Sequence, residues 1–367
     1  METPSWPALI RALIGRQALT AEQTAWAMNE IMEGAATPAQ IAGFGVALRA
    51  KGETAAEMSG LAASMLAHAT PFSVTGPVTD LVGSGGDGAQ TVNISTMATI
   101  VAAAAGVRMA KHGNRAASSA SGAADVLEAL GVVIDLSASA SEALLAEVGV
   151  AFLFASLYHP SFRHAGPVRS QLGVPTAFNY LGPLTNPSRP SSVAAGVADP
   201  AMGPVLAEVY AERRVSALVC HGGGLDELTT TGPSTVWIAV EGTVSETSFD
   251  PAALGLARST LADLRGGDPA HNAAVVRAVL AGETGPVRDI VLLNAAAAMA
   301  AADGLATVAA ARSADPAATA AATGEALVKT LSEGLSRAAA AVDSGTAAAL
   351  LARWVDASNR LATPRPR

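Results

Sequence analysis

The stretch LVGSGGDGAQTVNIST, residues 81–96, decides how the rest of the chain is interpreted. Gly83, Gly85 and Gly88 satisfy the G-x-G-x-x-G spacing of a dinucleotide-binding loop. In that fold the helix begins within the glycine loop, and an acid about 20 residues further on binds the ribose. Here no helix can begin before about residue 91, and the next strand-like run ends in the basic residues Lys111 and His112. The context excludes the dinucleotide interpretation, and a P-loop is excluded because no Gly-Lys-Ser/Thr closes the loop.

The same glycine loop fits another kind of phosphate site. Small residues let backbone N–H groups approach an anion, and the first turn of the following helix, with Asn93, Ser95 and Thr96, adds unpaired donors and a favourable dipole. Asp87 would repel phosphate on its own, but its carboxylate can accept from sugar hydroxyls or face a metal ion. The alternative for this stretch alone is a glycine-rich turn with an ordinary Asn or Ser helix cap.

A second segment, KHGNRAASSASGAADVLEALG at residues 111–131, places cations and small donors directly after a strand-like run. Arg forks onto two phosphate oxygens and Lys acts as a point charge, so a donor with two phosphate groups would use both. The alternative is a solvated polar loop. The polar residues concerned are Lys111, His112, Asn114, Arg115, Ser118, Ser119 and Ser121.

A third segment, HGGGLDELTTTGPS at residues 221–234, contains the adjacent acids Asp226 and Glu227 in a glycine-rich loop. Mg²⁺ is typically held by one or two carboxylates while it keeps waters and substrate phosphates as its other ligands. Two acids in a loop are usually a solvated turn, so this signal is weak alone. Beside a pyrophosphate-sized cradle it favours a metal site.

The bulk composition limits the partners of the protein. The 367 residues are half apolar with a net charge of −8, so there is no general basic surface for nucleic acid or an anionic membrane. Cys220 is the single cysteine, which fits a buried thiol and a reducing compartment. The N-terminus has no long apolar region typical of a secretory signal. Apolar stretches around residues 100–107 and 294–302 are too short to span a bilayer, so we expect a cytoplasmic protein.

The pattern along the chain predicts two domains. Residues 7–69 show helical spacing only, with Thr37 and Thr54 as helix starts, and a Pro/Gly-rich break follows at residues 71–79. Beyond it, strand-like and helical runs alternate, which predicts a mostly parallel sheet. The expected strands are 80–82, 107–110, 132–135, 150–155, 193–197 and 217–221, and the expected helices are 94–105, 123–129, 141–148, 203–213, 287–302 and 316–358.

Taken together and in this order, these blocks closely resemble the anthranilate phosphoribosyltransferase family of tryptophan biosynthesis. The resemblance covers nearly the whole chain, from TPAQIAGFGVALRAKGET through GSGGDG, NIST, KHGNR and ADVLEALG to FLFASLYHPSFRHAGPVRSQLG, FNYLGPLTNP and GLDELTTTGPS. It implies an α/β fold of the nucleoside phosphorylase/phosphoribosyltransferase type, in which a small all-helical domain is hinged to a large α/β domain with a mostly parallel central sheet. The division would be 1–73, joined by 161–185, and 74–367, with homodimers formed through the helical domain.

The resemblance also implies the site residues. Phosphoribosyl pyrophosphate would be bound by Gly83, Gly86, Asp87, Thr91, Asn93, Ile94, Ser95, Thr96, Lys111, Asn114, Arg115, Ser118, Ser119 and Ala123. Anthranilate would be bound by Gly83, His112, Asn114, His159 and Arg169, and Mg²⁺ by Ser95, Asp226 and Glu227. Ser84, Ala123 and Phe162 depart from the residues common at these positions in the family. The Ser84 change keeps a hydroxyl, whereas Ala123 and Phe162 lose polar contacts.

The chemistry of the residues agrees with that assignment. Transfer from C1 of the ribose passes through a cationic state while pyrophosphate leaves with growing negative charge, so the protein must position the donor and neutralise the leaving group. His112 and His159 are candidate catalytic proton acceptors, and each is equally plausible as a hydrogen-bonding or shape-determining residue. Two other functions stay open: a pyrimidine nucleoside phosphorylase, and a non-enzymatic relative that binds nucleic acid.

Overall fold

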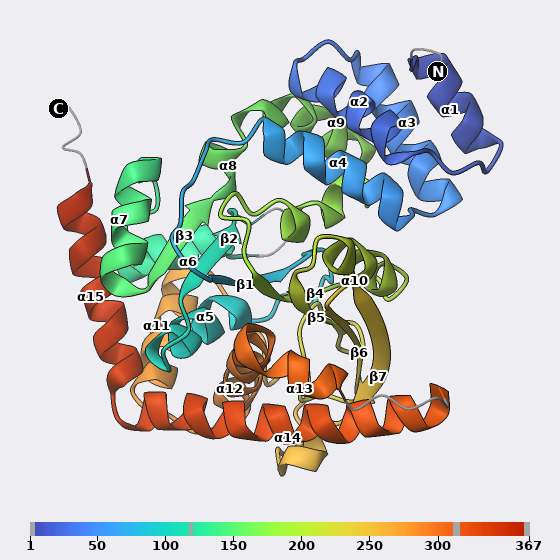
Figure 1. Ribbon diagram of the computed structural model, residues 1–367. Coiled ribbons are helices and arrows are strands. Elements are labelled where there is room, and N and C mark those ends of the chain that lie inside the picture. Colours follow the sequence, from blue (N-terminus) through green and yellow to red (C-terminus); the bar gives the residue numbers. More distant parts are fainter. Residues whose placement is uncertain (1–3, 117–119, 311–315, 363–367) are drawn as a thin grey trace.

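The computed structural model describes residues 4–116, 120–310 and 316–362, and it contains a small helical unit beside a larger α/β unit (Figure 1). The helical unit begins at the N-terminus, drawn in blue, and the α/β unit surrounds a seven-stranded sheet. The predicted fold class is therefore confirmed. Residues Ser118 and Ser119, which the sequence assigned to the donor site, lie outside the described residues.

Three of the four N-terminal helices begin at a threonine with a capping box. The side chains of Thr20, Thr37 and Thr54 each accept from a backbone N–H three residues later, and the Gln or Glu at that position accepts from the threonine N–H. The helix starts predicted at Thr37 and Thr54 are thus confirmed. The helices are α1 Trp6–Ile14, α2 Ala21–Met32, α3 Pro38–Lys51 and α4 Ala55–Ala67.

The sheet has the strand order β3-β2-β1-β4-β5-β6-β7. The first five strands in chain order pair in parallel, and β6 and β7 add an antiparallel hairpin at one edge. Because β2 and β3 extend the sheet to one side of β1 while β4 and β5 extend it to the other, the strand order reverses between β1 and β4. The strands are β1 Thr79–Gly83, β2 Met109–Gly113, β3 Val150–Phe154, β4 Ser192–Gly196, β5 Ser216–His221, β6 Ser234–Val240 and β7 Thr243–Phe249.

The strand expected at residues 132–135 is wrong. Its alternating apolar residues are buried, but they lie in an irregular connection that packs beneath α15 (Thr346–Leu361). The backbone N–H of Val133 donates to Ser358 Oγ at 3.1 Å, and Asn359 Nδ2 donates to the Gly131 carbonyl at 2.9 Å. Side chains of a distant helix therefore satisfy this backbone in place of a neighbouring strand. The hairpin of β6 and β7 is present in the structure but was not predicted, because the sequence pattern contains no clear signal for it.

Helices cover both faces of the sheet. In β4 and β5, alternate residues enter two different cores: Ala194 and Leu218 face one, and Val193 and Val219 face the other. The helices that follow the first four in the chain are α5 Ile94–Ala104, α6 Ala123–Leu130, α7 Ala138–Val148, α8 Ala155–Tyr158, α9 Gly166–Leu172, α10 Met202–Glu212, α11 Pro269–Leu280, α12 Pro286–Met299, α13 Leu305–Ala309, α14 Pro316–Asp343 and α15 Thr346–Leu361.

The helix from Pro286 to Ala309 is long and apolar enough to cross a membrane by length and composition. It comprises α12, a π-helical turn at Ala300–Gly304 and α13, so it is longer than the apolar run expected from the sequence. However, 72% of its most apolar window is buried inside the protein. It packs against α5 and α14 in the core of the α/β unit, which identifies it as a core helix (Figure 1).

The helical unit does not have a core of its own. One continuous apolar cluster joins α1–α4 to α10 and to one face of β4, β5 and β6. The segment between β3 and β4 contributes to this junction: a Cβ on Gly34 of α2's C-terminal turn would lie 3.0 Å from the His164 ring, and one on Gly45 of α3 would lie 3.2 Å from Phe178. These contacts accord with the expectation that residues 161–185 return to the helical unit, and the division at residues 73 and 74 stays a prediction.

We predict that Glu57→Ala destabilises the helical unit. The Glu57 carboxylate is fully buried and accepts from Lys51 Nζ at 2.8 Å and from the backbone N–H groups of Leu19 and Thr54 at 2.9 and 2.8 Å. Its loss leaves a buried cation and two backbone donors unpaired, which costs about 3–5 kcal/mol of unfolding free energy. Urea unfolding followed by the fluorescence of Trp6 and Trp26 measures this cost.

The matched control is Glu33→Ala, which removes an exposed glutamate from the C-terminal end of α2. We expect this variant to unfold within about 0.5 kcal/mol of the parent protein. Equal midpoints for the two variants would show that Glu57 does not hold the unit together.

Candidate active site

The predicted site residues gather where the strand order reverses. In an open parallel sheet, ligands bind in the crevice outside the carboxyl ends of the strands at such a reversal. The loops that follow β1, β2, β4 and β5 all leave the sheet at this edge, and they carry the three segments that the sequence singled out. The topology therefore brings together residues that are more than a hundred positions apart in the chain.

The glycine loop after β1 has a backbone that only glycine adopts readily. Gly85, Gly86 and Gly88 have φ angles of +70°, +84° and +70°, which lie in the left-handed region. The far end of the loop is held by a second segment, because Val92 N–H donates to the Leu264 carbonyl and Gly266 N–H to the Gln90 carbonyl, both at 2.9 Å. The loop is thus a fixed cradle, and α5 begins at Ile94 as the sequence predicts.

Asp226 reaches from the loop after β5 to the end of β1. Its Oδ2 accepts from the backbone N–H of Gly85 at 2.6 Å. A Cβ on Gly83 would overlap this carboxylate, and a Cβ on Gly196 at the end of β4 would overlap the Asp226 carbonyl. Glycine at both strand ends is therefore the condition for bringing the acidic loop against the phosphate cradle.

Lys111 lies beneath the cradle and is 2% exposed. Its Nζ donates to the Leu81 carbonyl at 2.6 Å and to Ser95 Oγ at 3.1 Å, so it links β2 to β1 and to the first turn of α5. Burial lowers the pKa of Lys111, whereas the negative charges of Asp80, Glu227 and Asp226 raise it and only partly offset the effect of burial. One buried cation thus lies among three acids.

The acids of the third segment repel each other at this point. Burial and the Asp87 carboxylate raise the pKa of Asp226 to about 7. Burial and the Asp226 carboxylate raise the pKa of Glu227 well above its ordinary value, and Lys111 opposes this increase. Within the described ranges, no group of three or more His, Cys, Asp or Glu side chains is placed to hold a metal ion by itself. Two acids beside a phosphate cradle instead suit a cation that also takes ligands from the substrate.

Asp80 and Asn186 support the strand ends from below. The Asp80 carboxylate is fully buried and accepts from the His112 backbone N–H at 3.1 Å and from Asn186 Nδ2 at 2.8 Å. Asn186 Nδ2 also donates to the Ala110 carbonyl at 2.7 Å. Burial raises the pKa of Asp80 to about 6, while Lys111 and these hydrogen bonds oppose the rise. Neither residue was predicted as a site residue, because Asp80 lies within a strand-like run and Asn186, in the FNYLGPLTNP block, has no spacing that indicates a site.

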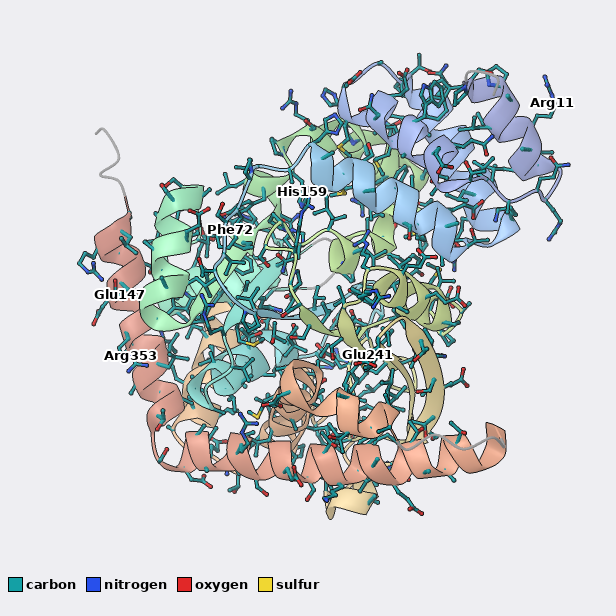
Figure 2. All side chains as sticks on the ribbon, viewed as in Figure 1. Arg11, Phe72, Glu147, His159, Glu241 and Arg353 are labelled. Atoms are coloured by element: carbon teal, nitrogen blue, oxygen red, sulfur yellow. The ribbon has the colours of Figure 1, made fainter. Side chains whose placement is uncertain are left out.

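His112 and His159 form a buried pair. Their ring centroids are 5.2 Å apart at an interplanar angle of 66°. His112 Nδ1 lies 3.1 Å from the Gly182 carbonyl, and His159 Nε2 lies 2.8 Å from the Thr185 carbonyl. Burial is the main cause that lowers the pKa of both rings, to about 3 for His112. His159 lies beneath α4, between the helical unit and the sheet (Figure 2).

Arg169 lies on α9, apart from the phosphate cradle. Its guanidinium Cζ is 5.2 Å from the centroid of the Phe162 ring, and burial lowers its pKa. Its Nε is buried without a hydrogen-bond partner among the described residues. A cationic fork with an unused, buried donor is suited to an anion such as a carboxylate.

The remaining donor-site residues have structural contacts here. Arg115 is half exposed and forms ion pairs with Asp125 and Glu128 of α6, at 2.9 and 2.5 Å. Asn93 donates to the Ser121 carbonyl and accepts from Asn272 of α11, so both of its polar atoms join neighbouring segments. Asn114 Oδ1 accepts from Ser156 Oγ at 3.1 Å. The guanidinium of Arg115 is thus engaged by α6, and the donor-binding roles of these residues stay predictions.

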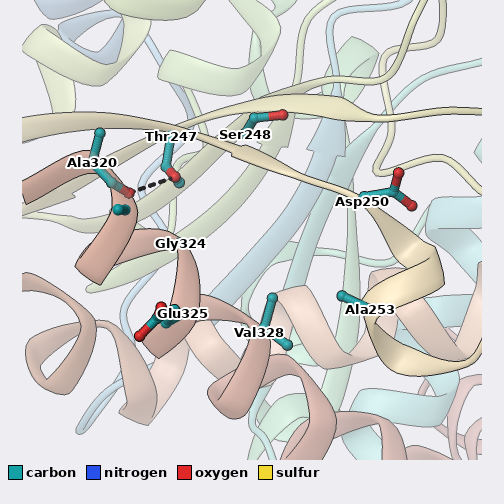
Figure 3. Close-up of a pocket in the computed structure, with 9 residues that line it drawn as sticks. Thr247, Ser248, Asp250, Ala253, Ala320, Gly324, Glu325 and Val328 are labelled. Atoms are coloured by element: carbon teal, nitrogen blue, oxygen red, sulfur yellow. Dashed lines mark hydrogen bonds between the residues drawn. The ribbon is translucent and has the colours of Figure 1, made fainter. Parts of the chain in front are cut away.

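A separate hollow of about 560 Å³ lies between β7 and α14 (Figure 3). Its charged residues are Asp250 and Glu325, and Thr247 Oγ1 donates to the Ala320 carbonyl across it at 3.0 Å. These acids would repel a phosphate, and β7 and α14 carry none of the predicted site residues. The hollow is therefore not part of the candidate site.

The chain matches two family descriptions that together span most of its length. Residues 75–348 match the family described as the glycosyl transferase family α/β domain, and residues 7–69 match its helical bundle domain. The family for the larger unit alone covers well over half of the chain.

Curated relatives are similar over almost the full length. The anthranilate phosphoribosyltransferase of Thermobifida fusca is 55% identical over 359 residues, which are 98% of this chain and 98% of that protein. The protein of the same name from Acidothermus cellulolyticus is 54% identical and covers 97% of this chain and 96% of its own.

Solved structures are similar to this chain in both fold and sequence. The crystal structure of anthranilate phosphoribosyltransferase from Thermus thermophilus is 38% identical, with a TM-score of 0.84 over 96% of this chain and 99% of that one. The Saccharomyces cerevisiae protein of that name, in complex with phosphoribosyl pyrophosphate and Mg, is 26% identical, with a TM-score of 0.82 over 97% and 98% of the two chains.

We predict that His112 stays neutral from about pH 4 to pH 8. The unfolded chain binds a proton at the ordinary pKa of 6.5, whereas burial holds the folded value near 3. The stability that the neutral ring contributes is therefore fully present above pH 6.5 and is lost as the pH falls toward 3. Imidazole ¹⁵N shifts measured across this pH range check the assignment, with the exposed His271 as an internal reference. A His112 midpoint above about pH 5 contradicts it.

Proposed function

The chain belongs to the anthranilate phosphoribosyltransferase family, and we propose that its residues divide the reaction between a magnesium-dependent donor site and a separate acceptor site. The enzyme transfers the phosphoribosyl group of phosphoribosyl pyrophosphate to the amine of anthranilate and releases pyrophosphate. The observation that carries the division is the position of Asp226, directly against Gly83 and Gly85 of the cradle. The acidic loop, the Lys111 side chain and the glycine cradle lie together at the strand ends, whereas Arg169 lies on α9.

The donor side holds the phosphates. The glycine cradle supplies backbone donors, α5 supplies the N-terminal end of a helix, and Lys111 supplies a buried cation. Gly83, Gly86, Asp87, Thr91, Asn93, Ile94, Ser95, Thr96, Lys111, Asn114, Arg115, Ser118, Ser119 and Ala123 are the residues that we propose for this side. Arg115 would have to exchange its ion pairs with α6 for the donor's phosphate, and a side chain that is half exposed can make this exchange.

The metal side would be formed by Ser95, Asp226 and Glu227. These residues fit Mg²⁺ because they present hard oxygen ligands, and because the two acids repel each other beside the phosphate cradle. Bound Mg²⁺ would neutralise the growing charge of the leaving pyrophosphate. The protein's own part is to hold the acids in place through Gly85 N–H and to add the charge of Lys111.

The acceptor side would bind anthranilate between the strand ends and the helical unit. Arg169 would bind the carboxylate through its unused donor, and His112 and His159 would face the amine. The amine nitrogen bonds to C1 of the ribose, the C1–oxygen bond breaks with its electrons leaving on pyrophosphate, and one amine proton must then be removed. A neutral imidazole can accept that proton.

The proposal also includes the compartment, the pathway and the oligomeric state of the protein. We propose a cytoplasmic enzyme of tryptophan biosynthesis, since the only cysteine is Cys220, which is buried and has no second cysteine to pair with. A homodimer through the helical unit is supported by the exposed apolar side chains of Ile14 and Val46 on α1 and α3. No observation favours a pyrimidine nucleoside phosphorylase or a nucleic-acid-binding protein, and the relatives carry neither name.

We predict that the double variant Asp226→Asn with Glu227→Gln loses activity but keeps its fold. Both changes preserve shape and remove two repelling charges, so the melting temperature should not fall. Turnover should fall roughly 100-fold or more, because a metal contributes several kcal/mol of charge stabilisation. Loss of anthranilate fluorescence, measured across a Mg²⁺ titration, tests this.

The control for the loss of two charges is Glu241→Gln with Asp356→Asn, since both side chains are exposed and lie outside the site. This variant should follow the Mg²⁺ dependence of the parent protein. An unchanged Mg²⁺ dependence in the Asp226 and Glu227 variant would show that these acids do not bind the metal.

We predict that Arg169→Ala weakens the use of anthranilate alone. A hydrogen bond to a charged partner contributes roughly 1.5–3 kcal/mol, so kcat/KM for anthranilate should fall about 10- to 150-fold. The KM for phosphoribosyl pyrophosphate should hardly change. Arg163→Ala is the matched control, because Arg163 lies in the same segment but is exposed. Equal losses for both substrates would remove Arg169 from the acceptor site.

A further inference from the structure

The turn at residues 181–185, between α9 and β4, has an unusual set of hydrogen bonds. Its five consecutive carbonyls each accept from a side chain. Leu181 O accepts from Thr185 Oγ1 at 2.8 Å, Gly182 O from His112 Nδ1 at 3.1 Å, Pro183 O from Tyr210 Oη at 2.7 Å, Leu184 O from Arg213 Nη1 at 2.7 Å and Thr185 O from His159 Nε2 at 2.8 Å. The turn is thereby fixed from several directions.

Two of these carbonyls determine which nitrogen of each imidazole carries the hydrogen. A carbonyl oxygen only accepts, so a neutral ring must place its hydrogen on the nitrogen that faces it. His112 is therefore the Nδ1–H tautomer, and His159 is the Nε2–H tautomer. Burial lowers the pKa of both rings, which keeps them neutral.

The opposite nitrogens are left as acceptors. His112 Nε2 is buried and has no hydrogen-bond partner among the described residues, in a side chain that is 3% exposed. His159 Nδ1 is buried as well, but it faces the backbone of Met65 on α4, and the 2.8 Å contact of Nε2 with the Thr185 carbonyl is the better-formed of the two. A buried acceptor without a partner is costly in a folded protein, so its retention indicates a ligand that donates. An aromatic amine has two N–H donors, and His112 Nε2 offers a buried acceptor for one of them.

Of the other three donors to the turn, Thr185 belongs to the turn itself, and two come from α10 and the residue that follows it. Tyr210 is 2% exposed, and burial raises the pKa of its phenol, which therefore keeps its hydrogen and donates. Arg213 follows α10 directly, and its side chain reaches Leu184. Neither residue is among those proposed to touch a substrate. Their two carbonyls lie between the two that orient the histidines.

We propose that Tyr210 and Arg213 are positioning residues for the acceptor amine: they hold the carbonyls of Pro183 and Leu184, and so set the direction of the neighbouring Gly182 and Thr185 carbonyls that fix the tautomers of His112 and His159. This inference rests on the proposed function for the identity of the amine. It extends the acceptor site to a helix that packs against β5 and β6. Tyr210 and Arg213 act on the histidines only through the five residues of this turn. A small shift of the turn therefore changes the hydrogen bonds of both imidazole rings together.

The experiment compares Tyr210→Phe and Arg213→Met with the parent protein. Each variant removes one donor to the turn and keeps most of the side-chain volume. In substrate-free protein, imidazole ¹⁵N shifts assigned with His112→Asn and His159→Asn variants should report single tautomers in the parent and mixed tautomers in both variants. With substrates, kcat/KM for anthranilate should fall roughly 2- to 30-fold while KM for phosphoribosyl pyrophosphate is unchanged.

Two further variants separate positioning from structure. Arg213→Lys keeps a charged donor and should restore part of the anthranilate kcat/KM, and Glu208→Gln, an exposed change on the same helix, should change nothing. Unchanged tautomers in both test variants overturn the proposal. So do equal losses for the two substrates together with a lower melting temperature, which mean a structural role only. If the parent protein consumes no anthranilate, the proposed function falls, and the tautomer measurement alone decides the role of Tyr210 and Arg213.

Discussion

The approach of Asp226 to the end of β1 is the contact on which the site depends. The carboxylate occupies the space that a side chain at Gly83 would need, and its backbone carbonyl occupies that of Gly196. Two strands that end in glycine on either side of the strand reversal thus leave room for a loop from a third strand. The hydrogen bond from Gly85 N–H then ties this loop to the cradle. The backbone N–H donors of the glycine loop and the acidic residues are neighbours because these strand ends carry no side chains.

This close approach concentrates charge below the protein surface, where the acids outnumber the buried cation Lys111. Lys111 and Asp80 attract each other on adjacent strands, and Asp226 and Glu227 add to the field around the same cation. Hydrogen bonds from Asn186 and from the His112 backbone hold Asp80 in place. Such a buried network is costly unless each member has a partner. A bound cation would compensate the excess of acids, and the donor phosphates would supply further oxygen ligands to that cation.

The sequence predicted the parts of the site that have a local signature, and it missed those that depend on tertiary contacts. Glycine runs, adjacent acids and a basic strand end can be recognised from spacing alone, and the resemblance then supplied His159 and Arg169. Residues 132–135 look like a strand, but Ser358 and Asn359 supply the partners of that connection from a distant helix. Asp80, Asn186 and Tyr210 have no local signature in the sequence, and only their hydrogen bonds in the folded chain distinguish them. The loop at 264–266 backs the cradle through its backbone, so its side chains carry no signal.

The two halves of the site differ in how they are held. The proposed donor half rests on strand ends, whose register is fixed by the sheet. The proposed acceptor half lies at the junction with the helical unit, where Arg49 of α3 pairs with Asp199 after β4, and Ser59 Oγ of α4 donates to Glu212 Oε2 of α10 at 2.7 Å. Glu212 lies between Tyr210 and Arg213, so the helix that supports the histidine turn is also the helix that the other unit contacts. Any movement of the helical unit would therefore reach the acceptor side first, and the phosphate cradle would keep its geometry while the aromatic substrate enters or leaves.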